Sequence, residues 1–464
     1  MRDDRAMSRV AIIGGGPGGY EAALVAAQMG ADVTLVDSDG IGGSAVLTDC
    51  VPSKALLAVA ESATQVRDSG SLGITGAAEA VGVDLAAVNA RIRGLAEAQS
   101  ADTAARCLRE GVRLVSGRGR LDGPDAVLVE GADGARERIA ADAVLVATGA
   151  RPRILATARP DGERILSWEQ VYGLAEVPER LIVVGSGVTG AEFACAYQAL
   201  GAEVVLVSSR AHVLPGEDSD AAQVLEGVFE RRGMTVLRRS RASAAERTED
   251  GVRVTLADGR TVEGSHCLMA VGSVPNTEDL GLAGAGVRTG PGGHIEVDRV
   301  SRTSTRGVYA AGDCTGVLLL ASVAAMQGRI AMWHALGGAV APLDLRTVSS
   351  NVFTDPEIAT VGYTQADVDE GRITAEVVTL PLATNARAKM QGITDGFVKV
   401  ICRRGTRIVI GGVVVAPKAS ELIFGLALAV EQRMTVDEVA ATFTVYPSLT
   451  GSLAEAARRL RAFD

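Results

Sequence analysis

Two glycine-rich segments constrain the fold of this 464-residue chain more than any other feature. Each has an apolar strand, a glycine turn, an alanine-rich helix and a second apolar strand, which is the order of a βαβ dinucleotide-binding unit. One such turn is a weak indication, because glycine turns are common. Two of them with complete flanking elements predict an α/β chain that binds two dinucleotides. The turn glycines are Gly14, Gly16 and Gly19 in the first unit, and Gly185, Gly187 and Gly190 in the second.

The strand that closes each unit predicts which ribose the unit accepts. The first strand ends in Asp37, and a carboxylate about 20 residues after the turn suits a ribose 2′-hydroxyl. The second ends in Ser208, Ser209 and Arg210, where an acid would repel a 2′-phosphate but serine can donate to it and arginine can pair with it. We therefore expect NADPH to be accepted, alone or beside NADH. The alternative, in which Arg210 is only a solvated surface charge, stays open.

Composition and charge exclude several classes of function. The net charge of -10 argues against nucleic acid, because that affinity rests on neutralising phosphates with lysine and arginine. No uninterrupted apolar run approaches the roughly 18 residues of a membrane span, and the charged stretch Met1–Arg9 is too short for a signal peptide. We expect a cytoplasmic protein without integral membrane association. The cysteines and the four histidines share no metal-ligand spacing, so no metal site is expected.

The stretch Gly42–Lys54, GGSAVLTDCVPSK, carries a single cysteine, Cys50. Together with the two nucleotide units, it resembles the flavoprotein disulfide reductases, and the resemblance covers nearly the whole chain. In that family two cysteines separated by four residues precede Pro-Ser-Lys. Here Ala45 takes the place of the first cysteine and Cys50 that of the second. The chain is therefore most similar to the NAD(P)H quinone reductase branch of the dihydrolipoamide dehydrogenase-like proteins, which lacks the disulfide.

The resemblance implies a glutathione reductase-like fold. It consists of two Rossmann-type dinucleotide-binding domains and a C-terminal α+β dimerisation domain, in a homodimer. Residues 1–150 and 276–345 are expected to form the FAD-binding domain, residues 151–275 the NAD(P)-binding domain, and residues 346–464 the dimerisation domain. The expected cofactors are FAD together with NADPH, NADH or both.

The resemblance also assigns site residues to positions of this chain. Lys54 would lie beside the flavin, pair with Glu192 after the second turn, and stabilise the negative charge of a reduced ring. Asp313, in the VYAAGDCTG motif, would hydrogen-bond the ribitol, and the next helix would point its N-terminus at the flavin. The other expected cofactor contacts are Ser44, Gly119, Thr148, Gly149, Leu320 and Ala321 for FAD, and Gly272 at the end of the nucleotide domain.

The last motif departs from the family pattern. Disulfide reductases carry a histidine before a proline there and a glutamate five residues later, and the partner subunit contributes this pair as the base. Here Tyr446 precedes Pro447, and Gly451 stands in the place of the acid. Tyrosine has a reference pKa of about 10 and is a poor base at pH 7. The chain thus lacks the disulfide partner, the base and the orienting acid that dithiol oxidation needs.

The preserved nicotinamide and flavin units predict an FAD-dependent NAD(P)H dehydrogenase (quinone) with Lys54, Glu192, Cys50 and Tyr446 as candidate catalytic residues. A quinone accepts electrons from reduced flavin without a thiol or a base. Three alternatives stay open: a dihydrolipoamide dehydrogenase, an oxidase or peroxidase that cycles Cys50 through sulfenic acid, and a non-enzymatic subunit of a dehydrogenase complex. Cys50 could equally tune the flavin or be a bystander.

Overall fold

The computed structural model describes residues 7–76 and 82–461, which form two compact units. The first unit contains the residues up to Ser53, together with Ala90–Arg153 and Gly272–Asp344. The second contains Lys54–Asn89, Ile154–Val271 and the residues from Leu345 onward. Most of the charged stretch Met1–Arg9 lies outside the described residues.

A five-stranded parallel sheet with the order β18-β7-β1-β2-β3 forms the centre of the first unit. Its middle strand β1 (Arg9–Ile13) is apolar on both faces, as a buried parallel strand must be. Val10 and Ile12 pack into the cluster that includes helix α1, whereas Ala11 and Ile13 pack into a second cluster on the other face. The other strands are β2 (Asp32–Asp37), β3 (Arg113–Ser116), β7 (Ala143–Val146) and β18 (Val308–Ala310).

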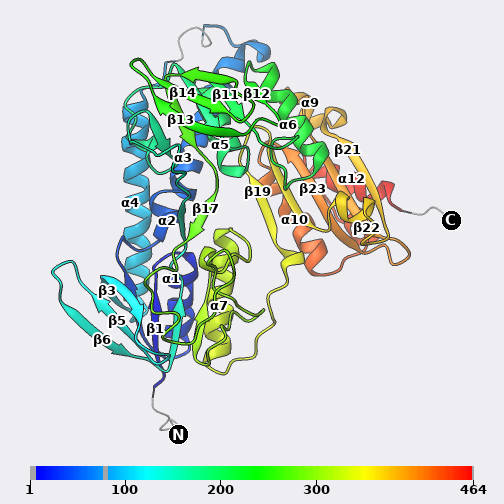
Figure 1. Ribbon diagram of the computed structural model, residues 1–464. Helices are drawn as coiled ribbons and strands as arrows, with labels where there is room; N and C mark the ends of the chain where they lie inside the picture. The colour runs from blue at the N-terminus through cyan, green and yellow to red at the C-terminus, as the bar shows by residue number, and fades with distance from the viewer. Residues whose placement is uncertain (1–6, 77–81, 462–464) are drawn as a thin grey trace. The chain divides into compact units, whose positions relative to one another are not determined.

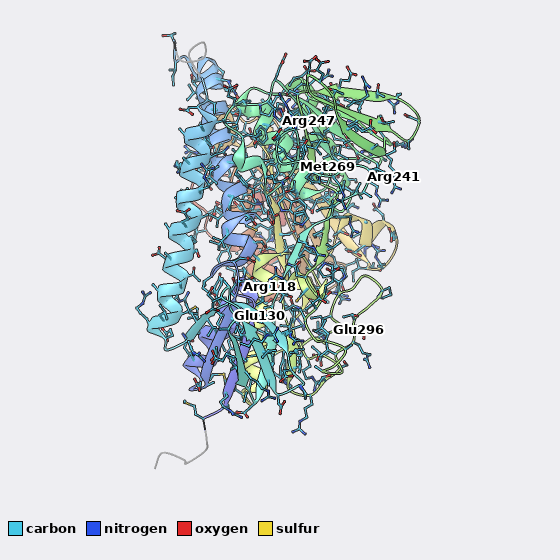
Figure 2. The ribbon with its side chains drawn as sticks, turned by 60° about the vertical axis from the view of Figure 1, so that its left-hand side comes forward. Arg118, Glu130, Arg241, Arg247, Met269 and Glu296 are labelled. Atoms are coloured by element: carbon cyan, nitrogen blue, oxygen red, sulfur yellow. The ribbon has the colours of Figure 1, made fainter. Side chains whose placement is uncertain are left out.

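Helices cover one face of this sheet and a small antiparallel sheet covers the other. Helices α1 (Pro17–Gln28) and α7 (Ala321–Ala335) pack side by side (Figure 1). Val127 and Val129 of the antiparallel sheet share a core cluster with Ile13. Arg118 and Glu130, labelled in Figure 2, are direct partners across its first two strands. Its strands are β4 (Arg118–Leu121), β5 (Ala126–Glu130) and β6 (Arg136–Ala140), and β8 (Ala150–Pro152) pairs with β17 (Ser273–Pro275).

The second unit contains another five-stranded parallel sheet, with the order β12-β11-β10-β16-β9. Its nucleotide turn joins the buried central strand β10 (Arg180–Val184) to helix α5 (Val188–Leu200). Valine and isoleucine side chains from these strands form a core with the antiparallel sheet β13-β14-β15. The further elements are β9 (Ile165–Ser167), β11 (Glu203–Val207), α6 (Ser219–Arg231), β12 (Thr235–Leu237), β13 (Ala242–Arg247), β14 (Val252–Leu256), β15 (Thr261–Gly264) and β16 (His266–Met269).

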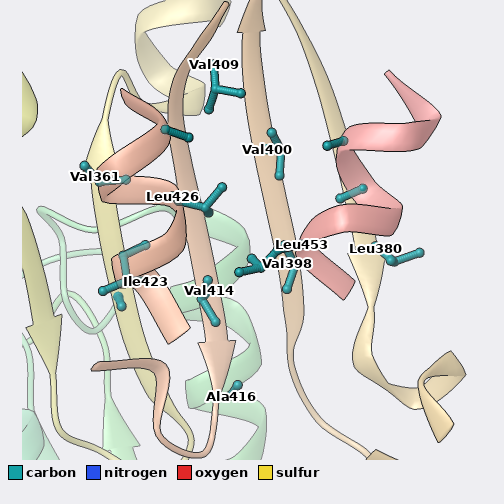
Figure 3. Packing of buried hydrophobic residues seen from close by; sticks show 14 of the residues in the cluster. Val361, Leu380, Val398, Val400, Val409, Val414, Ala416, Ile423, Leu426 and Leu453 are labelled. Atoms are coloured by element: carbon teal, nitrogen blue, oxygen red, sulfur yellow. The ribbon is translucent and has the colours of Figure 1, made fainter. Parts of the chain in front are cut away.

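The C-terminal part of the second unit is an α+β assembly. Its five-stranded antiparallel sheet has the order β19-β20-β23-β22-β21, and helix α10 (Ala419–Glu431) packs on it. Figure 3 shows the core, in which Ile423 and Leu426 of α10 meet Val398 and Val414 of the central strands. The other elements are β19 (Ser349–Val352), β20 (Glu357–Gly362), α8 (Gln365–Asp369), β21 (Ala375–Pro381), α9 (Ala386–Met390), β22 (Phe397–Arg403), β23 (Val409–Ala416), α11 (Val436–Ala441) and α12 (Gly451–Arg459). The predicted fold class is confirmed.

One helical stretch, Gly43–Leu72, is long and apolar enough to cross a membrane by length and composition alone. It comprises α2 (Gly43–Leu47), the long helix α3 (Cys50–Asp68) and a short 3-10 turn. In the second unit, Leu56 and Ala60 of α3 are buried, and Glu61 forms a 2.8 Å ion pair with Lys418. The absence of integral membrane association stays a prediction. The other long helix is α4 (Leu85–Arg109).

Candidate active-site residues

The first glycine turn, between β1 and α1, leaves a helix N-terminus open for a phosphate group. Gly14 has a φ of +105°, and a Cβ there would lie 2.3 Å from the carbonyl oxygen of Ala147, so this position requires glycine. Helix α1 begins after Gly16 with Pro17 in its first turn, and no side chain caps it. The N–H groups of this turn can therefore donate to the pyrophosphate of a dinucleotide.

Asp37 ties the end of β2 to the glycine turn. Its Oδ2 accepts a hydrogen bond from the Gly15 N–H at 2.6 Å, and its Oδ1 accepts from the N–H groups of Asp39 and Gly40. Each carboxylate oxygen has about two acceptor positions, so Oδ2 can accept one further bond. This capacity agrees with the predicted ribose contact of Asp37, which stays a prediction.

Asp313 lies in a turn that a buried glutamine holds in place. Gln327 is only 1% exposed, and its Oε1 accepts from the Gly312 N–H at 2.8 Å. Burial, with the charge of Asp49 as a second cause, raises the pKa of the Asp313 carboxyl to about 6. No hydrogen bond from the described residues contributes to this pKa. The carboxyl therefore remains available to a hydroxyl group of a ligand.

The N-terminus of α7 is a second open helix end in the first unit. Its N-cap residue Leu320 makes no side-chain capping bond, and Ala321 at the first helical position is exposed. The dipole of this 15-residue helix favours negative charge at that end. Two open helix N-termini and a carboxyl without a protein partner fit the FAD that the family resemblance implies.

The remaining flavin-side candidates occupy several elements of the first unit. The Thr148 hydroxyl donates to the carbonyl oxygen of Asn276 at 2.6 Å, which fixes the turn at Gly149. A Cβ at Gly119 on β4 would lie 3.1 Å from Ile13 Cγ2, so a larger residue would press on the sheet. Ser44 on α2 and Gly272 after the nucleotide domain have no contact that singles them out, and their predicted roles stay predictions.

Cys50 is the first residue of α3 and is partly buried, while Ala45 lies on α2. The six cysteines all fall within the described residues, and none of them forms a disulfide. The other five are all buried, and burial raises the pKa of each thiol, to about 12 for Cys195 and Cys267. Such thiols are inert, because the thiolate is the reactive form. Cys50 is therefore the thiol to test.

Among the described residues, no cluster of metal-binding side chains is found.

The second glycine turn, in the second unit, has the same geometry as the first. Gly185 has a φ of +111°, and a Cβ there would lie 2.1 Å from the carbonyl oxygen of Ala270. Helix α5 begins after Gly187 without a side-chain cap, and the position of a Cβ on Gly187 is open. A Cβ on Gly190 would collide with the Gly185 carbonyl oxygen at 1.9 Å, so the helix can pack closely on the turn. These features fit a second dinucleotide.

Ser208 and Arg210 have different environments at the end of β11. Ser208 is fully buried, and its hydroxyl lies 2.7 Å from the Ser186 hydroxyl. Its hydroxyl also accepts from the Arg210 N–H at 3.2 Å, so it shapes the loop from inside. Arg210 is exposed, and its carbonyl oxygen accepts from the N–H of Arg239, a second exposed arginine. The loops after β11 and β12 therefore present two arginines, of which only Arg210 was expected from the sequence.

Lys54 and Glu192 form the ion pair that the resemblance implies. The Lys54 Nζ lies 2.7 Å from Glu192 Oε2, and Glu192 is 2% exposed on the first turns of α5. Glu192 Oε1 accepts from the backbone N–H of Phe353 at 2.9 Å, and the Lys54 Nζ lies 5.0 Å from the centre of the Phe353 ring. Glu192 thus orients Lys54 over an aromatic face. Phe353 could not be found from the sequence, because it comes from a distant segment without a motif.

Tyr446 lies in an exposed loop before α12. Tyr446 is 87% exposed. Two neighbours in the loop are also exposed, Phe443 at 103% and Val445 at 78%. Gly451 is the first residue of α12 and supplies no carboxyl group to orient a base. Within the chain, the loop holds three apolar or aromatic side chains away from the core, which is the usual property of an interface segment.

Comparison with known proteins assigns the chain to a family. It matches the family described as pyridine nucleotide-disulphide oxidoreductase over residues 8–328, and the dimerisation domain of that family over residues 348–457. It is 56% identical to a protein named NAD(P)H dehydrogenase (quinone) from Mycobacterium tuberculosis, over 99% of this chain and 95% of that protein. It is 35% identical to dihydrolipoyl dehydrogenase 2 of Haloarcula marismortui, over 97% of this chain and 96% of that protein.

A solved structure agrees with this assignment. The crystal structure of LpdA from Mycobacterium tuberculosis superposes with a TM-score of 0.94 at 55% identity, and the match covers 98% of this chain and 100% of that one. The resemblance noted from the motifs is therefore confirmed across both nucleotide units and the C-terminal domain. The chain belongs to the pyridine nucleotide-disulphide oxidoreductase family.

Proposed function

We propose that the protein is an FAD-dependent NAD(P)H:quinone oxidoreductase. The observation that carries this proposal is the contrast between Ala45, where a redox disulfide needs its first sulfur, and the Lys54–Glu192 pair, which is intact at 2.7 Å. The chain keeps the groups that serve a nicotinamide and a flavin and lacks those that serve a dithiol. The 56% identical relative from Mycobacterium tuberculosis carries a name with the same activity, which supports the proposal.

The residues of the chain would bind, orient and stabilise, while bound FAD would supply the electron transfer itself. The open N-termini of α1 and α7 and the carboxyl of Asp313 would hold the cofactor in the first unit. In the second unit, Glu192 would fix the Lys54 ammonium, whose positive charge favours an anionic reduced ring. No described thiol has a partner thiol, so electrons would leave directly to the quinone.

Replacement of Cys50 by alanine is expected to leave quinone turnover within about threefold of the wild type, because a thiol takes no part in direct transfer. Steady-state rates with NADPH and a benzoquinone check this. The second candidate function, an oxidase or peroxidase that cycles Cys50, rests on the partly buried position of this thiol at the start of α3. It requires the variant to be inactive with every acceptor, and this result would replace the quinone proposal.

Retention of FAD is expected to depend on pH through Asp313. The carboxyl has a pKa of about 6 without a ligand, and a ribitol hydroxyl that donates to it would favour the ionised form and lower that pKa. Binding is therefore strongest above pH 6 and weakens below it, by at most about tenfold per pH unit down to the pKa of the bound state, because a proton must first be displaced. Flavin fluorescence on release measures the affinity at pH 7.5 and pH 5.0. In Asp313→Asn, the affinity for FAD should not depend on pH in this range. If the affinity falls equally from pH 7.5 to pH 5.0 in the wild type and in Asp313→Asn, Asp313 does not have this role.

NADPH is the nicotinamide cofactor that the loop after β11 favours. Arg210, after β11, and Arg239, after β12, are both exposed, and the Arg239 N–H donates to the Arg210 carbonyl oxygen at 2.9 Å, so two positively charged residues are adjacent at this end of the sheet. We expect Arg210→Ala to lower the ratio of kcat/KM for NADPH to that for NADH by about tenfold or more, since one charge-assisted contact is lost. Arg253→Ala, which removes an exposed side chain on β14, is the matched control. An unchanged ratio in Arg210→Ala would remove the assignment.

We infer a homodimer that forms through the C-terminal domain. The family match to a dimerisation domain over residues 348–457 supports it. The exposed loop with Phe443 and Tyr446, and Phe424 on α10 at 64% exposed, supply apolar surface for a second copy. The cytoplasm is the proposed location, in keeping with the free thiols and the acidic composition.

A further inference from the structure

A cleft of about 540 Å³ opens on the C-terminal sheet of the second unit, and it shares no residue with the nucleotide turn of that unit. Its walls come from the edge strand β21, the loop between β22 and β23, and the end of α12, which lie together in Figure 1. The volume is that of a site for a small organic molecule. The lining residues are Ala375, Glu376, Val377, Val378, Arg404, Arg407, Arg459, Leu460 and Arg461.

The cleft is strongly basic although the protein is acidic. Four arginines line it against one glutamate, in a chain whose net charge is -10. Arg459 pairs with Glu455 at 3.0 Å and Arg461 with Asp437 at 2.6 Å, whereas Arg404 only reaches Glu376 at 3.8 Å. Nearby carboxylates therefore neutralise the charges of Arg459 and Arg461. The charge of Arg404 is only weakly neutralised, and no ion pair of Arg407 is found among the described residues.

Arg407 has a guanidinium nitrogen without a partner among the described residues. Its Nη2 is buried and makes no hydrogen bond in the described protein, which is unfavourable for a guanidinium donor. Its backbone is fixed at a φ of +60°, where its N–H donates to the Arg403 carbonyl and its carbonyl oxygen accepts from the Val436 N–H, both at 2.9 Å. A left-handed conformation is rare for arginine. The fold thus fixes Arg407 in the wall of the cleft and leaves one nitrogen of its guanidinium group without an acceptor among the described residues.

We propose that this cleft binds a small phosphorylated anion that carries a di- or triphosphate group. Arginine forks match phosphate oxygens with paired hydrogen bonds, and several arginines around one pocket suit a ligand with more than one negative charge. Val377 and Leu460 give an apolar wall beside the arginines. Free pyrophosphate and a nucleoside triphosphate share this chemistry.

Calorimetric titration of the FAD-loaded, full-length protein with inorganic pyrophosphate, ATP and AMP tests the proposal. The wild type should bind pyrophosphate or ATP and should bind AMP at least about tenfold more weakly, because a single phosphate reaches fewer arginines. Equal affinity for pyrophosphate and ATP identifies the phosphate chain as the ligand, and tighter binding of ATP identifies a nucleotide. If neither pyrophosphate nor ATP binds, the proposal is wrong.

Arg407→Gln should weaken the binding by about tenfold or more, since a charge-assisted contact is removed. The matched control is Arg403→Gln, an exposed arginine at the end of β22 that does not line the cleft, and it should change the affinity by less than about threefold. Arg210→Ala, at the nicotinamide nucleotide loop, should also leave it unchanged. If Arg407→Gln does not fold by circular dichroism, Arg404→Gln takes its place. Equal effects of Arg407→Gln and Arg403→Gln, or loss of binding only in Arg210→Ala, would overturn the proposal.

Discussion

Replacement of Glu192 by alanine is expected to slow reduction of the flavin by NADPH by about a hundredfold, as loss of a preorganised electrostatic contact commonly does. Glu192 is 2% exposed, and its carboxylate forms an ion pair with the Lys54 ammonium at 2.7 Å. Without it, Lys54 is no longer fixed over the Phe353 ring, and the Phe353 N–H loses its acceptor at 2.9 Å. Stopped-flow bleaching of the flavin at saturating NADPH measures the rate.

The conservative variant separates a positioning role from a structural one. Glu192→Gln keeps an oxygen for the Phe353 N–H and keeps the shape of the side chain, but it removes the charge that holds Lys54. We expect its flavin reduction rate to lie between those of the wild type and the alanine variant, with a thermal midpoint close to that of the wild type. Lys54→Met should match the alanine variant in rate. If flavin reduction in Glu192→Ala is as fast as in the wild type, the ion pair has no part in the reaction.

Replacement of Lys399 by methionine is expected to lower the free energy of unfolding by about 3–5 kcal/mol, the usual cost of leaving a buried charge without its partner. Lys399 is fully buried on β22, and its Nζ lies 2.7 Å from both Asp218 and Asp220. The Asp218 side chain is 1% exposed and also caps α6, where it accepts from two backbone N–H groups. In the variant this carboxylate would be buried without a cation.

Urea denaturation of the second unit, followed by circular dichroism, measures this cost. The matched control is Asp220→Asn, because the Asp220 side chain is 53% exposed and its pairing with Lys399 is largely solvated. That variant should lose about 1 kcal/mol or less. A methionine variant as stable as Asp220→Asn would show that the buried lysine is not needed to hold the start of α6.

Local sequence signals were sufficient where one segment forms its own structure. The turns at Gly14 and Gly185 could be predicted because the close approach of a carbonyl oxygen excludes any side chain there. The returning strands and the ends at Asp37 and Arg210 followed from the spacing within each βαβ unit. The pairing of Lys54 with Glu192 was available only through the family resemblance, since 138 residues separate the two positions.

Contacts between distant segments could not be predicted. Ser208 was expected to face a ribose phosphate, but it is fully buried because Ser186 in the turn offers a hydroxyl partner at 2.7 Å. Nothing in the local sequence marks Gln327 as the acceptor that fixes the Asp313 turn, or Lys399 as the buried partner of Asp218. In each case the tertiary fold, rather than the residue type or its spacing, decides what the side chain contacts.

The most direct test of the central claim is a steady-state comparison of acceptors with the purified, FAD-loaded protein. NADPH oxidation is followed with a benzoquinone, and in parallel NAD(P)⁺ reduction is followed with dihydrolipoamide. Because Ala45 replaces the first sulfur and Tyr446 the base, we expect quinone turnover with a kcat/KM at least about a thousandfold above that for dihydrolipoamide, the usual cost of losing both nucleophile and base. Efficient oxidation of dihydrolipoamide without quinone turnover would contradict the account.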